Sequence, residues 1–140
     1  ADLVFRSGGQ LNMLGLNLTH QVLMGSVHAD HCYALKTPVG KTVGDLLNFN
    51  GRTHGTEKGA NLGAMHDPCA VLAVTHPELF TSKPRSAVIE LEGSHTRCQT
   101  LIDETEWVDK EKNCNVYYEV EAEKVIELIL QAVSEVDLNG

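Results

Sequence analysis

The chain has 140 residues, 42% of them hydrophobic, so it can bury a core and is too apolar to be disordered. Its formal net charge is −8 and its 11 Lys and Arg residues are scattered, which argues against a nucleic-acid partner. No apolar run reaches the length that a membrane requires. With no secretory signal and four separated cysteines, we expect a reduced, cytoplasmic protein.

The first third of the chain predicts one strand and two helices. Residues 1–5 resemble the end of a helix, residues 10–18 (QLNMLGLNL) predict a buried strand, and Thr19 can cap a turn or helix. Residues 26–37 predict a helix that Ser26 caps and that ends near Pro38. Residues 39–50 predict a weaker helix, which Gly51 would stop.

Residues 51–65 contain four glycines and few apolar side chains, which predicts a loop. Long loops inside domains often carry function. The next helix is expected from Asp67, with Pro68 in its first turn and Pro77 at its end. Local spacing alone makes Asp67 a helix cap, but a carboxylate here can also bind a hard cation, and the adjacent His66 can exchange a proton.

The second half predicts strands and a closing helix. Residues 86–93 alternate apolar and polar side chains, residues 96–104 are a plausible strand, and residues 115–123 place Val116, Tyr118 and Val120 on one face. Residues 121–136 predict a helix with one apolar stripe, which consists of Val125, Ile126, Ile129, Leu130 and Val133. This order of elements favours an α/β fold that forms a single unit over residues 1–140.

Several spaced segments resemble the inosine-uridine-preferring nucleoside hydrolase family. They are residues 4–23 (VFRSGGQLNMLGLNLTHQVL), 65–80 (MHDPCAVLAVTHPELF), 88–103 and 113–130, in the family's order. The resemblance implies an open sheet flanked by helices and hydrolysis of the N-glycosidic bond of ribonucleosides to base and ribose, as in nucleoside salvage. It also implies a calcium ion, with Asp67 as one metal ligand and His66 beside the leaving base as the catalytic residue.

The loop that contains Phe49, Arg52 and His54 lies where the family has a mobile substrate-covering segment, although a plain surface loop is an equally good interpretation. Phe49 and His54 are therefore candidate substrate-binding residues. His20 can hydrogen-bond near the site, although a structural role is the simpler interpretation. A small-molecule nucleoside is the expected partner.

The resemblance implies an Asp-rich run that supplies further calcium ligands and the general base, and this run has no counterpart in these 140 residues. The resemblance therefore covers the C-terminal portion of such an enzyme. One carboxylate cannot fill a calcium shell of six to eight oxygens. We expect the isolated chain to be inactive and, if it is an excised piece, to self-associate or form homo-oligomers.

Two positions depart from the family pattern. Asn17 replaces the usual Asp, which keeps hydrogen-bonding shape but loses charge, and we interpret the position as structural. Cys98 replaces a usual Gly, which bears on the local strand geometry.

Other functions remain open from the sequence alone. A degenerate, non-catalytic module that binds a nucleoside or a protein is the main alternative, followed by a structural α/β domain in which Asp67 is only a cap. A zinc site built from His28, His31 and Cys32, or from His95 and Cys98, has no second ligand pair at a normal spacing.

Overall fold

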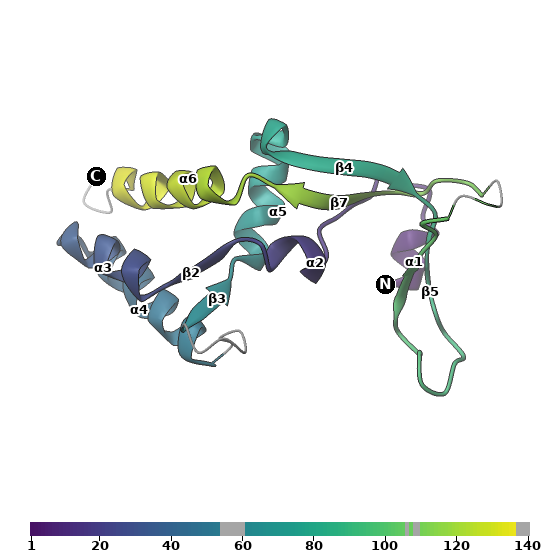
Figure 1. The fold of residues 1–140 in the computed structure, drawn as a ribbon, viewed down its shortest axis with the longest axis horizontal. Coiled ribbons are helices and arrows are strands. Elements are labelled where there is room, and N and C mark those ends of the chain that lie inside the picture. The colour runs from purple at the N-terminus through teal and green to yellow at the C-terminus, as the bar shows by residue number, and fades with distance from the viewer. Residues whose placement is uncertain (54–60, 106, 108–109, 137–140) are drawn as a thin grey trace.

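The largest sheet has three strands and runs along the upper part of the molecule (Figure 1). The computed structural model describes residues 1–53, 61–105, 107 and 110–136. Strand β7 (Cys114–Val120) lies in the middle, parallel to β1 (Asn12–Met13) and antiparallel to β4 (Phe80–Arg85). The mixed α/β class and the open sheets are as the sequence predicts.

Strand β4 was not predicted, because its segment FTSKPR lacks an apolar alternation. Four of its six residues are exposed, and it forms an edge of the sheet. Pro84 cannot donate to a neighbouring strand, and edge strands are where sheets tolerate proline. The partner strand, rather than local sequence, therefore makes this segment extended.

The expected single face of β7 is wrong, because the strand contains an irregularity. Thr81 pairs with Glu119 and Ser82 with Tyr117, so β7 holds one extra residue, Tyr118, between the two pairs. A bulge of this kind re-aims the side chains on its two sides. Val116 and Tyr118 consequently pack in one apolar cluster, whereas Val120 packs with Tyr117 in the other.

A second, two-stranded sheet joins β2 (Leu23–Gly25) to β3 (Leu62–Ala64) in antiparallel register. The Met65 N–H continues the ladder by donating to the Val22 carbonyl at 3.0 Å. The end of the expected loop over residues 51–65 is therefore a strand. Its three residues, two of them Gly and Ala, are too few and too small to signal a strand by pattern.

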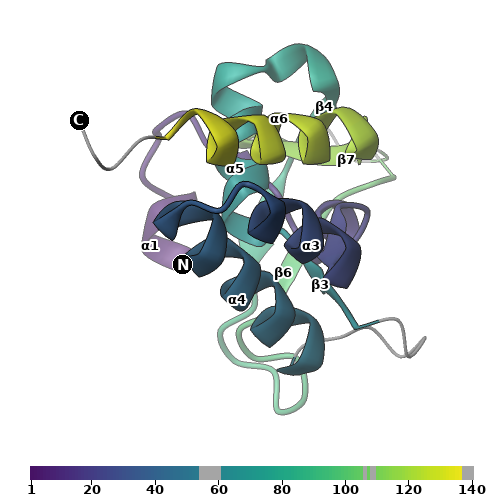
Figure 2. The ribbon, with the colours of Figure 1, turned by 90° about the vertical axis from the view of Figure 1, so that its left-hand side faces the viewer.

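The described helices are α1 (Asp2–Phe5), α2 (Leu16–Thr19), α3 (Ser26–Ala34), α4 (Pro38–Thr53), α5 (His66–Thr75) and α6 (Ala122–Glu135), with a 3₁₀ turn η1 (Pro77–Leu79). Helix α6 lies over α3 and α4 (Figure 2). The expected strand over residues 10–18 is wrong beyond Met13, because the chain turns at Gly15 into α2. Ser26 is the first helical residue, so Gly25 rather than Ser26 precedes the helix.

Gly51 does not stop α4, which continues to Thr53. A Cβ at Gly51 would lie 2.1 Å from the Asn61 carbonyl oxygen, so only glycine permits this contact between helix and chain. The close approach holds the last turn of α4 against the residue that leads into β3. Glycine here serves tertiary packing, which local propensity does not reveal.

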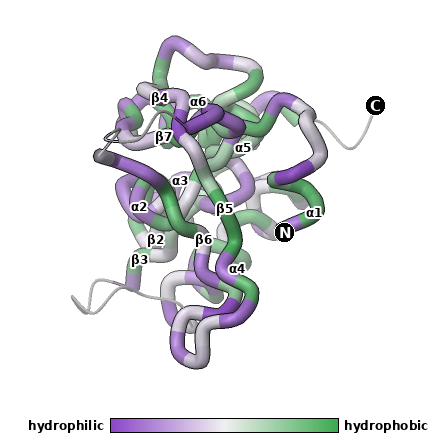
Figure 3. Tube along the Cα trace, turned by 90° about the vertical axis from the view of Figure 1, so that its right-hand side faces the viewer, coloured by the Kyte–Doolittle hydropathy of each residue, from purple (hydrophilic) through white to green (hydrophobic). Residues whose placement is uncertain are grey.

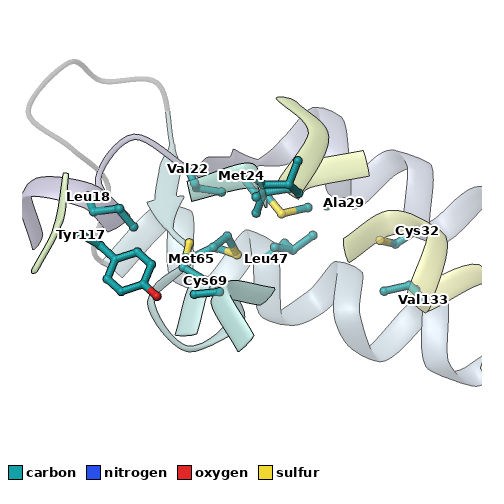
Figure 4. Packing of buried hydrophobic residues seen from close by; sticks show 13 residues of the cluster. Leu18, Val22, Met24, Ala29, Cys32, Leu47, Met65, Cys69, Tyr117 and Val133 are labelled. Carbon is teal, nitrogen blue, oxygen red and sulfur yellow. The ribbon is translucent and has the colours of Figure 1, made fainter. Parts of the chain in front are cut away.

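The main core gathers buried side chains from strands β2 and β7 and from helices α2, α3, α4, α5 and α6 (Figure 4). The apolar stripe of α6 is confirmed, with Val125 fully buried and Val133 nearly so. The remaining fully buried members of this core are Leu18, Val22, Met24, Ala29, Cys32 and Cys69. A smaller cluster around Val116 and Ala87 lies on the opposite face of β7.

A third sheet is the hairpin of β5 (Ala87–Ile89) and β6 (Thr100–Ile102), which extends away from the body of the molecule (Figure 3). Both strands were predicted. The Cys98 N–H donates to the Glu90 carbonyl at 2.7 Å as the chain returns toward β6, and Cys98 has φ of 74°. This is the left-handed region that favours glycine, which accounts for the family's usual residue there.

Among the residues that the structure describes, none of the helices combines the length and the apolar character needed to cross a bilayer.

Replacing Cys98 by Gly should raise the free energy of unfolding. A left-handed backbone costs a residue with a Cβ about 1–2 kcal/mol, and part of that gain is offset because glycine has more freedom in the unfolded chain. We expect a net gain of about 0.5–1 kcal/mol from Cys98→Gly in urea unfolding. Cys98→Ala is the matched control, since it removes the thiol but keeps the Cβ; an equal gain in both variants would contradict the backbone explanation.

Candidate active site

The candidate site forms where α2 ends and α5 begins. The pairing of β2 with β3, continued by the Met65–Val22 hydrogen bond, brings residues 19–22 beside residues 64–66. Leu18, Val22 and Cys69 are fully buried around this junction and anchor both segments in the core. His66 and His20 remain exposed at the surface above it.

His66 is held by contacts with two residues of the α2 segment. Its Nδ1 lies 2.8 Å from the Thr19 hydroxyl oxygen. Its ring centroid lies 5.8 Å from that of His20, with 51° between the ring planes. The structure thus brings together His66 and His20, which are separated by more than forty residues in the chain.

Asp67 is not the helix cap that local spacing predicts. Met65 occupies the cap position, and Asp67 lies in the first turn of α5 without a side-chain capping bond. Its carboxylate is exposed and makes no hydrogen bond or ion pair with another described residue. An unpaired carboxylate next to the positive end of a helix can accept a ligand that carries positive charge or donates hydrogen bonds.

The described residues supply one carboxylate to a cation at this position and not a complete shell. No group of three or more His, Cys, Asp or Glu residues that could hold a metal ion occurs among them. Cys69 follows Asp67 by two residues but is fully buried, and burial raises the pKa of its thiol to about 11. The thiol therefore stays protonated near neutral pH and is a poor metal ligand. Asp67 could give a hard cation one oxygen donor, and such a cation would need several further oxygen donors.

Asn17 has a structural contact that supports our interpretation of this position. Its Nδ2 donates to the Tyr117 carbonyl at 3.1 Å, and its own carbonyl accepts from Gln21 Nε2 at 3.0 Å. Only the first of these bonds ties α2 to the central strand β7, because the second joins α2 to the residues that directly follow it. A charged aspartate could not donate the first of them.

The two predicted substrate-binding residues are placed differently. Phe49 lies on α4 with 59% of its surface exposed, and it lines a hollow with Tyr33, Asp45 and Arg52 on the outer side of α3 and α4. The described contacts do not bring it together with His66. His54 lies outside the described residues, so both assignments stay predictions.

His28 is engaged in the fold rather than free for a metal. Its Nδ1 accepts a hydrogen bond from the Gly25 N–H at 3.1 Å. Burial and the neighbouring His31 lower the pKa of His28 below its ordinary value. The structure therefore explains this histidine as part of the start of α3.

Sequence reasoning missed the contact between Thr19 and His66. It assigned Thr19 only to capping, yet its hydroxyl reaches across to the start of α5. No local sequence pattern predicts a hydrogen bond between two residues that are separated by 47 positions in the chain. The only hint was that Thr19 and His66 both lie in segments that carry the family resemblance.

Known proteins share this arrangement of elements. A sequence model of the family described as inosine-uridine preferring nucleoside hydrolase matches residues 1–127. A pyrimidine-specific ribonucleoside hydrolase of Shewanella woodyi is 32% identical over 134 residues, which are 95% of this chain and 43% of that protein. A second such enzyme, from an Enterobacter species, is 30% identical over 96% of this chain and 44% of its own.

Solved structures agree with the sequence comparison. A purine-preferring ribonucleoside hydrolase from Gardnerella vaginalis matches with a TM-score of 0.81 and 31% identity, over 96% of this chain and 42% of its own. A plant nucleoside hydrolase reaches a TM-score of 0.82 at 21% identity, over 96% and 44%, and supports the fold alone. The chain spans less than half the length of these relatives.

Replacing Asn17 by Asp should weaken the link between α2 and β7. The variant exchanges the amide donor for a carboxylate that faces the Tyr117 carbonyl, so we expect the free energy of unfolding at pH 7 to fall by about 1 kcal/mol. Asn12→Asp is the control, because Asn12 Oδ1 accepts from Asn115 Nδ2 and a carboxylate keeps that role. Urea unfolding measures both; an unchanged Asn17→Asp variant would argue that the hydrogen bond does not stabilise the fold.

Proposed function

Because the chain belongs to the inosine-uridine preferring nucleoside hydrolase family, we propose that it contributes His66 and Asp67 to a site that hydrolyses the N-glycosidic bond of ribonucleosides. The observation that carries the proposal is the pairing of an exposed, unpartnered Asp67 carboxylate with an exposed His66 whose Nδ1 is already engaged. Asp67 in the first turn suits the positive end of α5, but its carboxylate makes no hydrogen bond or ion pair with a described residue. A ligand outside the chain would give it such a partner.

The reaction requires a proton at the leaving base. When the bond between the ribose C1′ and the base nitrogen breaks, the electron pair leaves with the base and positive charge develops on the sugar. A protonated His66 would donate from Nε2 to a nitrogen of the base, which leaves as a neutral molecule. Water completes the product by bonding to C1′ and giving one of its protons to a base distinct from His66.

Asp67 is proposed as one oxygen ligand of a calcium ion. Bound there, the ion would supply positive charge that polarises the attacking water and the ribose hydroxyls. Asp67 lies directly next to His66 at the start of α5, so the sugar and the base of one nucleoside would lie over adjacent residues. This adjacency supports a division of labour in which Asp67 acts on the ribose side and His66 on the base side.

The proposed substrates are ribonucleosides as a class, without a preference for one base. One relative is named pyrimidine-specific and another purine-preferring, at 32% and 31% identity. Their common chemistry is the ribosyl bond, which His66 and Asp67 would serve for either base. Contacts of Phe49 and His54 with the base, self-association of the chain and a cytoplasmic location stay predictions.

The purified chain alone should not hydrolyse inosine or uridine, with or without calcium, because its described residues include no group of three or more His, Cys, Asp or Glu that could hold a metal ion. Joined behind the N-terminal part of the Gardnerella vaginalis enzyme, the same chain should give calcium-dependent release of base and ribose. Activity of the chain alone would contradict the first expectation. A folded, inactive chimera that still binds nucleoside would favour the non-catalytic binding module.

In the active chimera, substitutions of Asp67 and His66 should change different quantities, the calcium requirement and kcat respectively. Asp67→Asn should raise the calcium concentration needed for half-maximal activity by about 10-fold or more, since it removes a charged ligand. His66→Ala should lower kcat on nucleosides by about 10²–10⁴-fold and leave the calcium midpoint unchanged. Asp30→Asn, at an exposed position on α3, is the matched control; calcium midpoints that stay equal across all variants would remove Asp67 from the site.

A further inference from the structure

Thr19 is the one buried polar residue in the part of the chain that the structure describes. Only 2% of its surface is exposed, and its neighbours Leu18 and Val22 are fully buried. It ends α2, so its backbone is set by that helical turn, and its β-branched side chain has little rotational freedom. The Thr19 hydroxyl is therefore a polar group with a restricted position among buried apolar side chains.

The hydroxyl has two partners. Its oxygen lies 2.8 Å from His66 Nδ1 and 3.4 Å from the Gly15 carbonyl oxygen. That carbonyl already accepts from the backbone N–H groups of Leu18 and Thr19, at 3.0 and 3.1 Å. The contact with His66 is the shorter of the two and joins α2 to α5. His66 Nδ1 is therefore the main hydrogen-bond partner of the buried hydroxyl.

A hydroxyl can donate or accept, whereas an imidazole nitrogen has one role at a time. Thr19 can donate to a bare Nδ1, or it can accept from Nδ1–H while its own proton points at the Gly15 carbonyl. Nδ1 therefore has a partner in either form of the ring. Nε2 makes no hydrogen bond with a described residue and belongs to an exposed side chain.

We propose that Thr19 is a positioning residue: its buried hydroxyl holds Nδ1 of His66 and so presents Nε2 to the leaving base. This inference rests on the proposed role of His66. Thr19 itself does not touch the substrate, because it is covered by the core. The ring of His20 lies alongside His66 but is exposed, so it limits ring rotation from one side without fixing which nitrogen points outward.

The chain contains a matched comparison for this contact. Thr75 Oγ1 lies 2.9 Å from His76 Nδ1, but the two residues are neighbours in sequence and Thr75 is exposed. Water can replace that hydroxyl, whereas it cannot reach the buried Thr19 hydroxyl. The same chemical pair therefore occurs once in a buried and once in an exposed setting.

Nuclear magnetic resonance of the purified, isotope-labelled chain tests the proposal without requiring hydrolysis. At alkaline pH, where ordinary imidazoles are neutral, we expect the proton shared between the Thr19 hydroxyl and His66 Nδ1 to exchange slowly with water and to correlate with both groups, whichever of the two carries it. Thr19→Ser should keep this correlation. Thr19→Val, which keeps the branched shape, should lose it and increase the mobility of the His66 ring, while Thr75→Val leaves His66 unchanged.

Two results would overturn the proposal: absence of the correlation in the unaltered chain, or an unchanged His66 ring in a folded Thr19→Val variant. If Thr19→Val does not fold, the unaltered chain and Thr19→Ser decide the question by themselves. The outcome is separate from that of the proposed function. Loss of the His66 role in catalysis would leave this hydrogen bond in place, and loss of the hydrogen bond would leave the His66→Ala experiment valid.

Discussion

The pairing of β2 with β3 is the contact on which the candidate site depends. Three residue pairs and the added Met65–Val22 hydrogen bond join two segments that lie about forty residues apart. Because α2 directly precedes β2 and α5 directly follows β3, the pairing also sets His66 against Thr19 and His20. A short β-ladder therefore places the residues of the candidate site beside one another.

Buried side chains of the core stabilise the pairing of β2 with β3. Leu18 and Val22 come from one segment and Met65 and Cys69 from the other, and all four belong to the same apolar cluster. Their burial holds the backbone that carries the exposed side chains of His20, His66 and Asp67. Asn17 adds a polar tie from α2 to the central strand through the Tyr117 carbonyl. The site is thus polar at its surface and apolar directly beneath, an arrangement that restrains side chains without burying charge.

The site that we propose would supply half of the catalytic arrangement that the reaction needs. Proton donation to a leaving base and stabilisation of a developing positive sugar are opposite electrostatic demands, and they need separate groups. His66 suits the first demand. The second demand calls for negative charge, whereas the cation proposed at Asp67 would act on the attacking water, and no group of three or more His, Cys, Asp or Glu residues that could hold it occurs among the described residues. The chain spans less than half the length of the relatives it matches.

Residues with a strong local pattern were predictable. The stripe of α6 and the alternating strands β5 and β7 follow from periodicity, and the His-Asp-Pro segment with its flanking motifs points to the family. Elements that depend on a distant partner were missed or misplaced. These are the polar edge strand β4, the short strand β3, the continuation of α4 through Gly51 and the extra residue at Tyr118.

The sequence by itself determined the family, the α/β class and the identity of His66 and Asp67 as candidates. Only the tertiary structure decided that Asp67 is not a cap, that Asn17 ties α2 to β7, and that Thr19 contacts His66. The reason is physical. A periodic pattern records which side of an element faces the core, but a hydrogen bond between residues 17 and 117 or 19 and 66 exists only once the chain between them has folded.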